Sequence, residues 1–218
     1  MDAGVLSFLP DWSHLLPFML AALALNLTPG ADMTYVLSRS LAQGRAAGLA
    51  SALGIFTGSA LHTLLAAVGV AALIAASEVG YRVLTWAGAA YLVYLAVKLW
   101  REDTTLEALR RRGPASLTRI WLEGTLVNLF NPKVALFILA FLPQFTQPER
   151  GLVWAQILVL GTLFNIGGTA VNGAVALAAG SLAERLRAEP RIKRWMNRIC
   201  ATLLGALALR LATSARVS

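Results

Sequence analysis

The sequence contains little charge for its length: 14% of the 218 residues are charged, whereas 57% are hydrophobic. A soluble domain carries about 25% charged residues, so this chain has too few charges to cover a surface in water. The charges are also clustered, and residues 46–77 and 151–183 contain no Asp, Glu, Lys or Arg. Apolar runs longer than about 18 residues are typical of membrane helices. The composition therefore predicts a multi-pass protein of the inner-membrane type, with the lipid bilayer as its surroundings.

Cysteine and histidine are also scarce, with one Cys and two His in the whole chain. A single cysteine, Cys200, excludes an intramolecular disulfide, and no CxxC motif or His/Cys cluster is present to hold a metal, so we expect no metal and no cofactor. No nucleophile or pair of carboxylates is spaced to act with His62, which argues against an intramembrane enzyme. The net charge of +8 would suggest nucleic acid in a soluble protein. In a membrane protein, basic loops mostly set the orientation, so we expect no nucleic-acid partner.

The hydrophobic runs predict an all-α integral membrane protein with six transmembrane helices in one membrane domain, residues 1–218. The N-terminus opens with an acidic residue and lacks a basic region, so we do not expect a cleavable signal peptide. Fourteen Lys and Arg residues fall on one side of the predicted helices and four on the other. By the positive-inside rule the fourteen face the cytoplasm, which places both termini outside. The predicted spans are residues 15–38, 48–76, 80–98, 119–142, 152–178 and 195–213.

Two similar interruptions indicate an internal repeat. The stretch NLTPGAD at 26–32 and the stretch NLFNPK at 128–133 each begin with Asn-Leu and contain a proline three or four residues from that Asn. Each lies within a predicted span, the first or the fourth, and a charge-free run of similar length follows. Because each half has three spans, the second half must enter the membrane upside down. We therefore predict a 3+3 inverted repeat, residues 15–98 and 119–213, joined by a cytoplasmic linker at 99–118.

Proline within a helix removes a backbone hydrogen bond, but proline at the first helical position is well tolerated after a Thr or Asn cap. Thr28-Pro29 and Asn131-Pro132 have that form, so we predict that spans one and four are broken helices whose second halves start at the breaks. Paired broken helices in an inverted repeat indicate a transporter site near the membrane midplane. The alternative is an ordinary proline kink, which is common in membrane helices.

Asp32 and Lys133 are the most deeply placed charges, and a lone ion at the bilayer centre costs at least about 2.5–3.5 kcal/mol. They pair directly or face one cavity, or else form a purely structural ion pair. A zwitterionic amino acid suits this site, with its ammonium at Asp32 and its carboxylate at Lys133 and the helix starts. In span five, Asn165, Thr169 and Asn172 form a polar stripe that lines the cavity or makes interhelical hydrogen bonds. The predicted substrate-binding residues are Asn26, Thr28, Pro29, Gly30, Asp32, Asn128, Asn131, Pro132, Lys133, Asn165 and Asn172.

Uphill transport needs a group that changes charge between two access states. We hypothesise that Asp32 binds a proton and the substrate ammonium in alternation. His62, the one histidine within a predicted span, is a second candidate for proton coupling, although a hydrogen-bonded structural histidine is the commoner case.

The chain resembles the LysE/RhtB family of bacterial amino-acid exporters. The similarity is carried by NLTPGADMTYVLSRSLAQGRAAGLASALGIFTG, by GAAYLVYLAVKLWR at 88–101, and by NLFNPKVALFILAFLPQF at 128–145. Family members usually have Pro-Gly-Pro where this chain has Pro29-Gly30-Ala31, which could alter the rigidity of the first break. The resemblance implies secondary active export of amino acids or close derivatives, an antiport driven by protons, and a homodimer as a further expectation. The alternatives are a six-span exporter of another small solute or a divalent cation, or a membrane protein that does not transport.

Overall fold

The computed structural model describes residues 8–77, 79–80, 113–179 and separate positions between 83 and 100 and between 195 and 209; within 70–76 it describes only the backbone. The described residues form helices and connecting turns, with no strand among them. The α-helices are α1 (Trp12–Leu27), α2 (Ala31–Gln43), α3 (Arg45–Ala76), α5 (Leu117–Leu129), α6 (Pro132–Leu136) and α7 (Val153–Leu177). Three short elements follow α6: the π-helix η2 (Phe137–Phe141) and the 3-10 helices η3 (Leu142–Phe145) and η4 (Pro148–Arg150).

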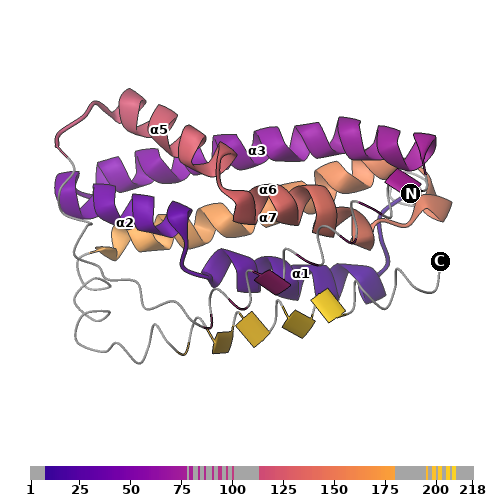
Figure 1. Cartoon of the computed structure of the whole chain (residues 1–218). Helices are drawn as coiled ribbons and strands as arrows, with labels where there is room; N and C mark the ends of the chain where they lie inside the picture. The colour runs from indigo at the N-terminus through magenta and orange to yellow at the C-terminus, as the bar shows by residue number, and fades with distance from the viewer. Residues whose placement is uncertain are drawn as a thin grey trace, which may run out of the picture.

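The two longest helices, α3 and α7, run side by side along the molecule (Figure 1). Each is long and apolar enough to cross a membrane by length and composition, and they correspond to the predicted spans 48–76 and 152–178. Gly44 separates α2 from α3 with a φ of +83°, a left-handed conformation that glycine adopts without steric cost. The chain can therefore turn back sharply, so that α2 packs along α3.

The other described helices form two bent pairs. Helices α1 and α2 meet at a bend of 45°, and α5 meets the helical stretch Pro132–Phe145 at a bend of 53°. If each pair is counted as one span, up to four spans lie within the described part of the chain. In Figure 1, α1 and the α6 stretch occupy one half of the length of α3, and α2 and α5 occupy the other. Both bends therefore lie near the middle of the bundle.

Several predictions concern residues outside those described. The predicted spans 80–98 and 195–213 are described only at separate positions, all of them helical, and most of the linker 99–118 is not described. The count of six spans, and the predicted spans 80–98 and 195–213 themselves, stay predictions.

Glycines allow α5 to approach α3 closely. A Cβ atom on Gly54 would lie 2.1 Å from the Trp121 carbonyl oxygen, and one on Gly58 would lie 2.7 Å from that of Thr125. On the opposite side of this contact, a Cβ atom on Gly124 would lie 2.8 Å from the Ser51 oxygen. Small residues are the usual means of bringing membrane helices together.

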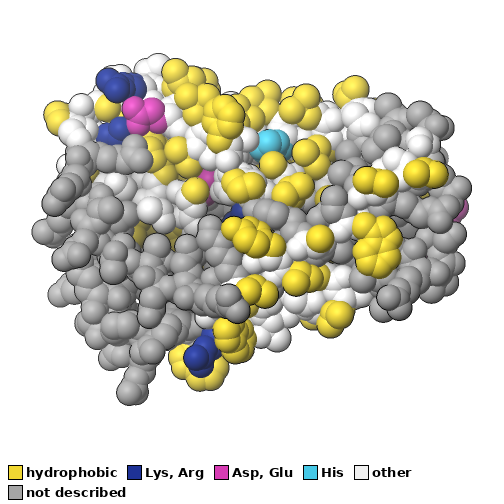
Figure 2. Space-filling model, in the orientation of Figure 1, with side chains coloured by type: hydrophobic (Ala, Val, Ile, Leu, Met, Phe, Trp, Pro, Cys, Tyr) yellow, Lys and Arg dark blue, Asp and Glu magenta, His cyan; other side chains and the backbone are white. Residues whose placement is uncertain are grey.

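The interior is aromatic where α1, η2, η3 and α7 meet. Phe137 stacks with Phe164 at a centroid separation of 4.8 Å and with Phe141 at 4.9 Å, and Phe18 packs against Phe145 at 5.5 Å. Large hydrophobic side chains also cover much of the described surface in Figure 2, whereas charged atoms are few on that face. An apolar exterior is what a bilayer requires of the helices that face it.

Candidate functional site

The two bends lie against each other, and Lys133 joins them. Its Nζ atom donates hydrogen bonds to the carbonyl oxygens of Leu25 and Thr28, each at 2.9 Å. These oxygens belong to the last turn of α1 and to the residue that ends it. The C-terminal end of a helix has unpaired carbonyls and a partial negative charge, so an ammonium group there is favourable. Lys133 therefore connects the first break to the second.

At the first break, the predicted cap was wrong. Thr28 does not cap the start of α2: it ends α1, and its hydroxyl donates to the Ala24 carbonyl at 2.7 Å. Helix α2 begins at Ala31, after Gly30 as the capping residue, so Pro29 lies between the helices. The physical reason is that a residue before proline disfavours helical backbone, which ends α1 at Leu27 and leaves the hydroxyl close to the last carbonyls of α1.

At the second break, the predicted cap is confirmed. Asn131 precedes α6, its Oδ1 atom accepts a hydrogen bond from the Lys133 backbone N–H at 3.0 Å, and Pro132 is the first helical residue. The same dipeptide pattern therefore produces different local structures at the two breaks.

Asp32 lies in the first turn of α2, where the helix dipole favours a negative charge. Its Oδ2 atom accepts a hydrogen bond of 2.9 Å from Asn128 Nδ2 on α5. Asn128 is almost completely buried. A bond between a carboxylate and a buried amide is charge-assisted, so it is stronger than a neutral one. It links the start of α2 to the end of α5 across the two halves of the chain.

Four buried polar atoms near these breaks have no hydrogen-bond partner within the described part of the chain. They are Asp32 Oδ1, Asn128 Oδ1, Asn131 Nδ2 and His62 Nε2. Buried polar atoms are nearly always paired, because an unpaired one keeps the full cost of its desolvation. Two of the four are oxygens that accept hydrogen bonds, one is an amide nitrogen that donates, and the histidine nitrogen can do either. The cluster thus offers complementary positions to a small ligand that has both donors and acceptors.

His62 occupies the same side of α3 as Gly58, one turn further along. Gly58 itself packs against Asn128, since a Cβ atom there would lie 2.9 Å from Asn128 Cβ. The expectation of an ordinary hydrogen-bonded histidine is not met at Nε2. Gly30 lies at the other side of the site, where an added Cβ would be 3.4 Å from Lys133 Nζ.

Three further predicted site residues, Asn26, Asn165 and Asn172, lie on α7 or contact it. Asn26 donates from Nδ2 to the Phe164 carbonyl at 3.1 Å, so it joins α1 to α7. Asn165 accepts from the Ser59 hydroxyl and donates to Thr63 Oγ1 at 3.3 Å, which makes it part of a polar contact between α3 and α7. For Asn165, the structure shows the interhelical hydrogen bonds that were one of the two alternatives. Asn172 is buried on α7, two turns further along.

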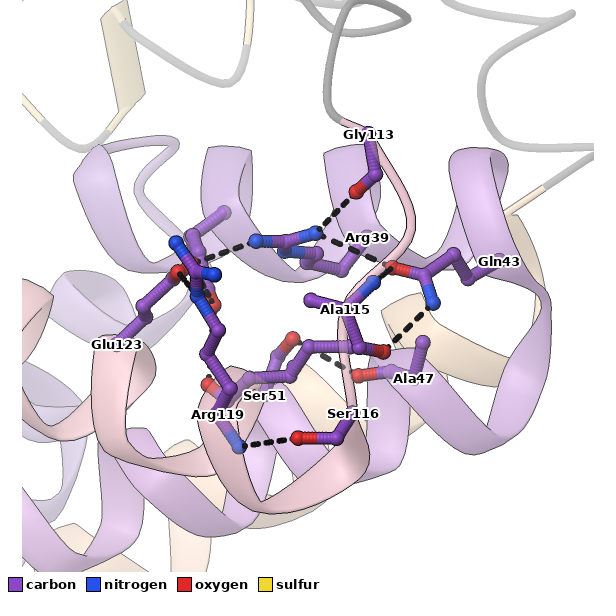
Figure 3. A network of polar contacts seen from close by, with 11 residues as sticks. Arg39, Gln43, Ala47, Ser51, Gly113, Ala115, Ser116, Arg119 and Glu123 are labelled. Atoms are coloured by element: carbon purple, nitrogen blue, oxygen red, sulfur yellow. Dashed lines mark hydrogen bonds and ion pairs between the residues drawn. The ribbon is translucent and has the colours of Figure 1, made fainter.

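The sequence analysis did not predict a second polar centre, which lies where the C-terminal half of α2 meets the N-terminal half of α5 (Figure 3). Arg39 Nη2 and Glu123 Oε2 form an ion pair of 2.6 Å. In the sequence, Arg39 is one of the fourteen basic residues assigned to the cytoplasmic side, and no partner was predicted for it. The available signal was the acidic Glu123 within predicted span 119–142, because an intramembrane acid needs a partner.

A family model described as LysE type translocator matches residues 23–215 of the chain. An uncharacterized membrane protein of Vibrio cholerae is 34% identical, over 91% of this chain and 96% of its own length. A homoserine/homoserine lactone efflux protein of Salmonella typhimurium is 32% identical, over 78% and 81% of the two chains. A leucine efflux protein of Salmonella choleraesuis is 28% identical over 97% of each. No solved structure matches the chain.

Proposed function

The chain belongs to the LysE type translocator family, whose members are exporters and not enzymes, and the family predicted from the sequence is thereby confirmed. On that premise we propose that this membrane protein is a secondary active exporter of amino acids or close derivatives, in the inner membrane of a bacterium. The names of two relatives support the substrate class, since one exports homoserine and its lactone and the other leucine.

The observation that carries the proposal is the set of unpaired polar atoms between the two breaks. The ammonium of an amino acid would donate to Asp32 Oδ1 and Asn128 Oδ1, which are both acceptors without a described partner. Its carboxylate would accept from Asn131 Nδ2, on the side of the positive charge of Lys133. His62 Nε2 would bind a further polar group of the substrate or exchange a proton. One small zwitterion would then satisfy four atoms whose burial is otherwise costly.

The broken helices and the inverted repeat are part of this proposal. Their support is that the two Asn-Leu pairs pack in matching ways. Asn128 packs against Gly58 of α3, and Asn26 packs against Gly168 of α7, where an added Cβ would lie 2.9 Å from Asn26 Oδ1. Each broken helix thus contacts the long helix of the other half through the same residue type. The bias of fourteen basic residues against four supports external termini.

In the proposed cycle, the protonation and deprotonation of Asp32 couple proton movement to substrate export. When Asp32 releases its proton to the cytoplasm, the carboxylate binds the substrate ammonium and its hydrogen bond to Asn128 holds the site in shape. On the outer side the ammonium leaves and a proton replaces it. The proton motive force then returns the protonated site inward. The proposal does not need a metal, and no cluster of three His, Cys, Asp or Glu side chains occurs within the described residues.

The test is amino-acid export from cells loaded with dipeptides. A host without exporters of this family is given each dipeptide in turn, and intracellular amino acids are measured with and without the chain. We expect the chain to lower the accumulation of a subset of amino acids and the Asp32→Asn variant to lose that effect. The proposed function would be rejected if the protein is present in the membrane and the accumulation of every amino acid tested is unchanged. The homodimer stays a prediction.

A further inference from the structure

The polar centre at the ends of α2 and α5 contains four side chains, which we name the α2–α5 cluster: Tyr35, Arg39, Gln43 and Glu123. Figure 3 labels the last three of them. Arg39 donates to Glu123 at 2.6 Å, and also to Gln43 Oε1 and the Gly113 carbonyl at 3.1 Å each. The Tyr35 hydroxyl lies 2.9 Å from the Ile120 carbonyl and 3.1 Å from Glu123 Oε2. The cluster therefore ties the half of the first bent pair after its break to the half of the second before its break.

Gln43 extends the same contact to the segment that leads into α5. Its Nε2 atom donates to the Ala115 carbonyl at 2.9 Å, and its Oε1 atom accepts from the Ala115 N–H at 3.1 Å. The side-chain amide of Gln43 thus pairs with both backbone groups of Ala115, as the backbone of a neighbouring β-strand would. It fixes the entry of α5 against the exit of α2, so the two helix ends cannot separate without breaking bonds on both.

A second cluster lies at the opposite ends of the same bent pairs, and we name it the α1–η4 cluster: Asp11, Gln147 and Arg150. Arg150 forms an ion pair with Asp11, and Gln147 exchanges hydrogen bonds with Asp11. It joins the start of the first bent pair to the end of the second. Each cluster thus contains an arginine–carboxylate ion pair and a glutamine, and each joins the first bent pair to the second.

The clusters differ in how far water reaches them. The side chains of Arg39 and Glu123 are 5% and 27% exposed, whereas those of Arg150 and Asp11 are 33% and 48% exposed. An exposed ion pair contributes little to stability because water competes for both ions. Removing one partner of a buried ion pair strongly destabilises the fold, because the other ion stays buried without a partner. The bundle is therefore closed more tightly at the α2–α5 end.

We propose that the α2–α5 cluster is a gate, which closes the path between the Asp32 site and one face of the membrane and separates when the site opens to that face. This rests on the proposed transport function. A polar contact suits a gate, because its groups can be hydrated when they part, whereas separated apolar surfaces would face water at a large cost. The α1–η4 cluster is the corresponding gate at the other end. Both clusters are formed in this conformation, and the α2–α5 cluster is the more buried of the two.

The experiment measures the opening of each end by pulsed electron paramagnetic resonance in lipid nanodiscs, without substrate. In a Cys200→Ala background, spin labels are attached at exposed positions through Ala42→Cys with Thr118→Cys for the α2–α5 end. Ser13→Cys with Glu149→Cys reports on the other end. We expect Arg39→Gln to increase the population with a longer distance between labels at 42 and 118 about tenfold, a typical size for coupling between states. The distance between labels at 13 and 149 should stay the same or shorten.

Arg119→Gln is the matched control, because Arg119 also binds Glu123, at 3.0 Å, but is 73% exposed and lies on α5 itself. It should leave both distances unchanged. Glu123→Gln replaces Arg39→Gln if the latter does not fold, and it should open the same end. The gate is refuted if neither cluster variant lengthens the first distance, if both ends widen together, or if Arg119→Gln has the same effect. Because no substrate is present, this outcome is separate from that of the dipeptide assay.

Discussion

Gly58 on α3 supports the site from behind, and adding one methyl group there tests the packing argument directly. The Cβ atom of Gly58→Ala would lie 2.7 Å from the Thr125 carbonyl oxygen, 2.9 Å from Asn128 Cβ and 3.0 Å from Asn128 Oδ1, where ordinary contacts begin at 3.4 Å. Because the first of these atoms belongs to the backbone of α5, it cannot turn away. Either α5 moves from α3, or the Asn128 side chain leaves its place beside Asp32.

The size of the effect follows from two opposing contributions. Overpacking a methyl group into a well-packed contact costs about 1–3 kcal/mol. Alanine stabilises a helix over glycine by roughly 0.5–1 kcal/mol. The net loss is at most about 2.5 kcal/mol, which lowers the unfolding temperature of a chain of this size by up to about 10 °C. Efflux should fall about tenfold or more, since a hydrogen bond to a charged group contributes about 1.5–3 kcal/mol and the Asn128–Asp32 bond would be displaced.

Gly69→Ala is the control on the same helix, because an added Cβ at Gly69 has no atom within 4 Å. It should leave efflux unchanged and keep or raise the unfolding temperature. Both variants are measured by thermal unfolding of the detergent-solubilised protein and by efflux from dipeptide-loaded cells. Equal unfolding temperatures and equal efflux for the two variants would refute the close approach of α3 and α5.

Three further predictions concern coupling, the second break and topology. Asp32→Asn should lose uphill, proton-driven efflux from vesicles while keeping downhill exchange of labelled substrate. The reason is that the amide keeps the shape of the carboxyl group but cannot change its charge. Full uphill efflux by this variant would exclude Asp32 from the coupling mechanism. Pro132→Ala should insert normally but transport more slowly, since Asn131 is then free to adopt helical backbone and close the break; unchanged efflux would make the break incidental. A reporter enzyme fused after Ser218 should be active outside the cell and one fused within residues 110–112 inside it, and a cytoplasmic C-terminus would contradict the six-span topology or its orientation.

Much of the site could be predicted from local chemistry. The prolines at 29 and 132 interrupt helices wherever they occur, because they lack an N–H group and restrict the residue before them. Asn131 was recognised as a cap because its partner lies two residues away. The two long helices followed from uninterrupted apolar runs, and the family followed from three sequence stretches.

Other parts of the site depend on partners that are distant in the chain. Thr28 could have capped α2, but the folded chain places its hydroxyl at the Ala24 carbonyl. The sequence indicated Lys133 as a partner for a carboxylate, but not that its Nζ atom also donates to two carbonyl oxygens more than a hundred residues away. Asn165 and Asn172 share a face of one helix, but only the packing of α7 on α3 decides that Asn165 binds Ser59 and Thr63.

Within the described residues, the sequence by itself therefore indicated where the long helices run and where the bent pairs are interrupted, and it indicated the family, because hydropathy, proline geometry and sequence similarity do not depend on distant contacts. Tertiary structure alone decided which polar groups pair and which buried polar atoms have no partner among the described residues. Asp32 and Asn128 are 96 residues apart, and Arg39 and Glu123 are 84 apart. A polar side chain in an apolar bundle binds whichever partner the packing brings within about 3 Å, and that choice belongs to the assembled helices rather than to any one segment.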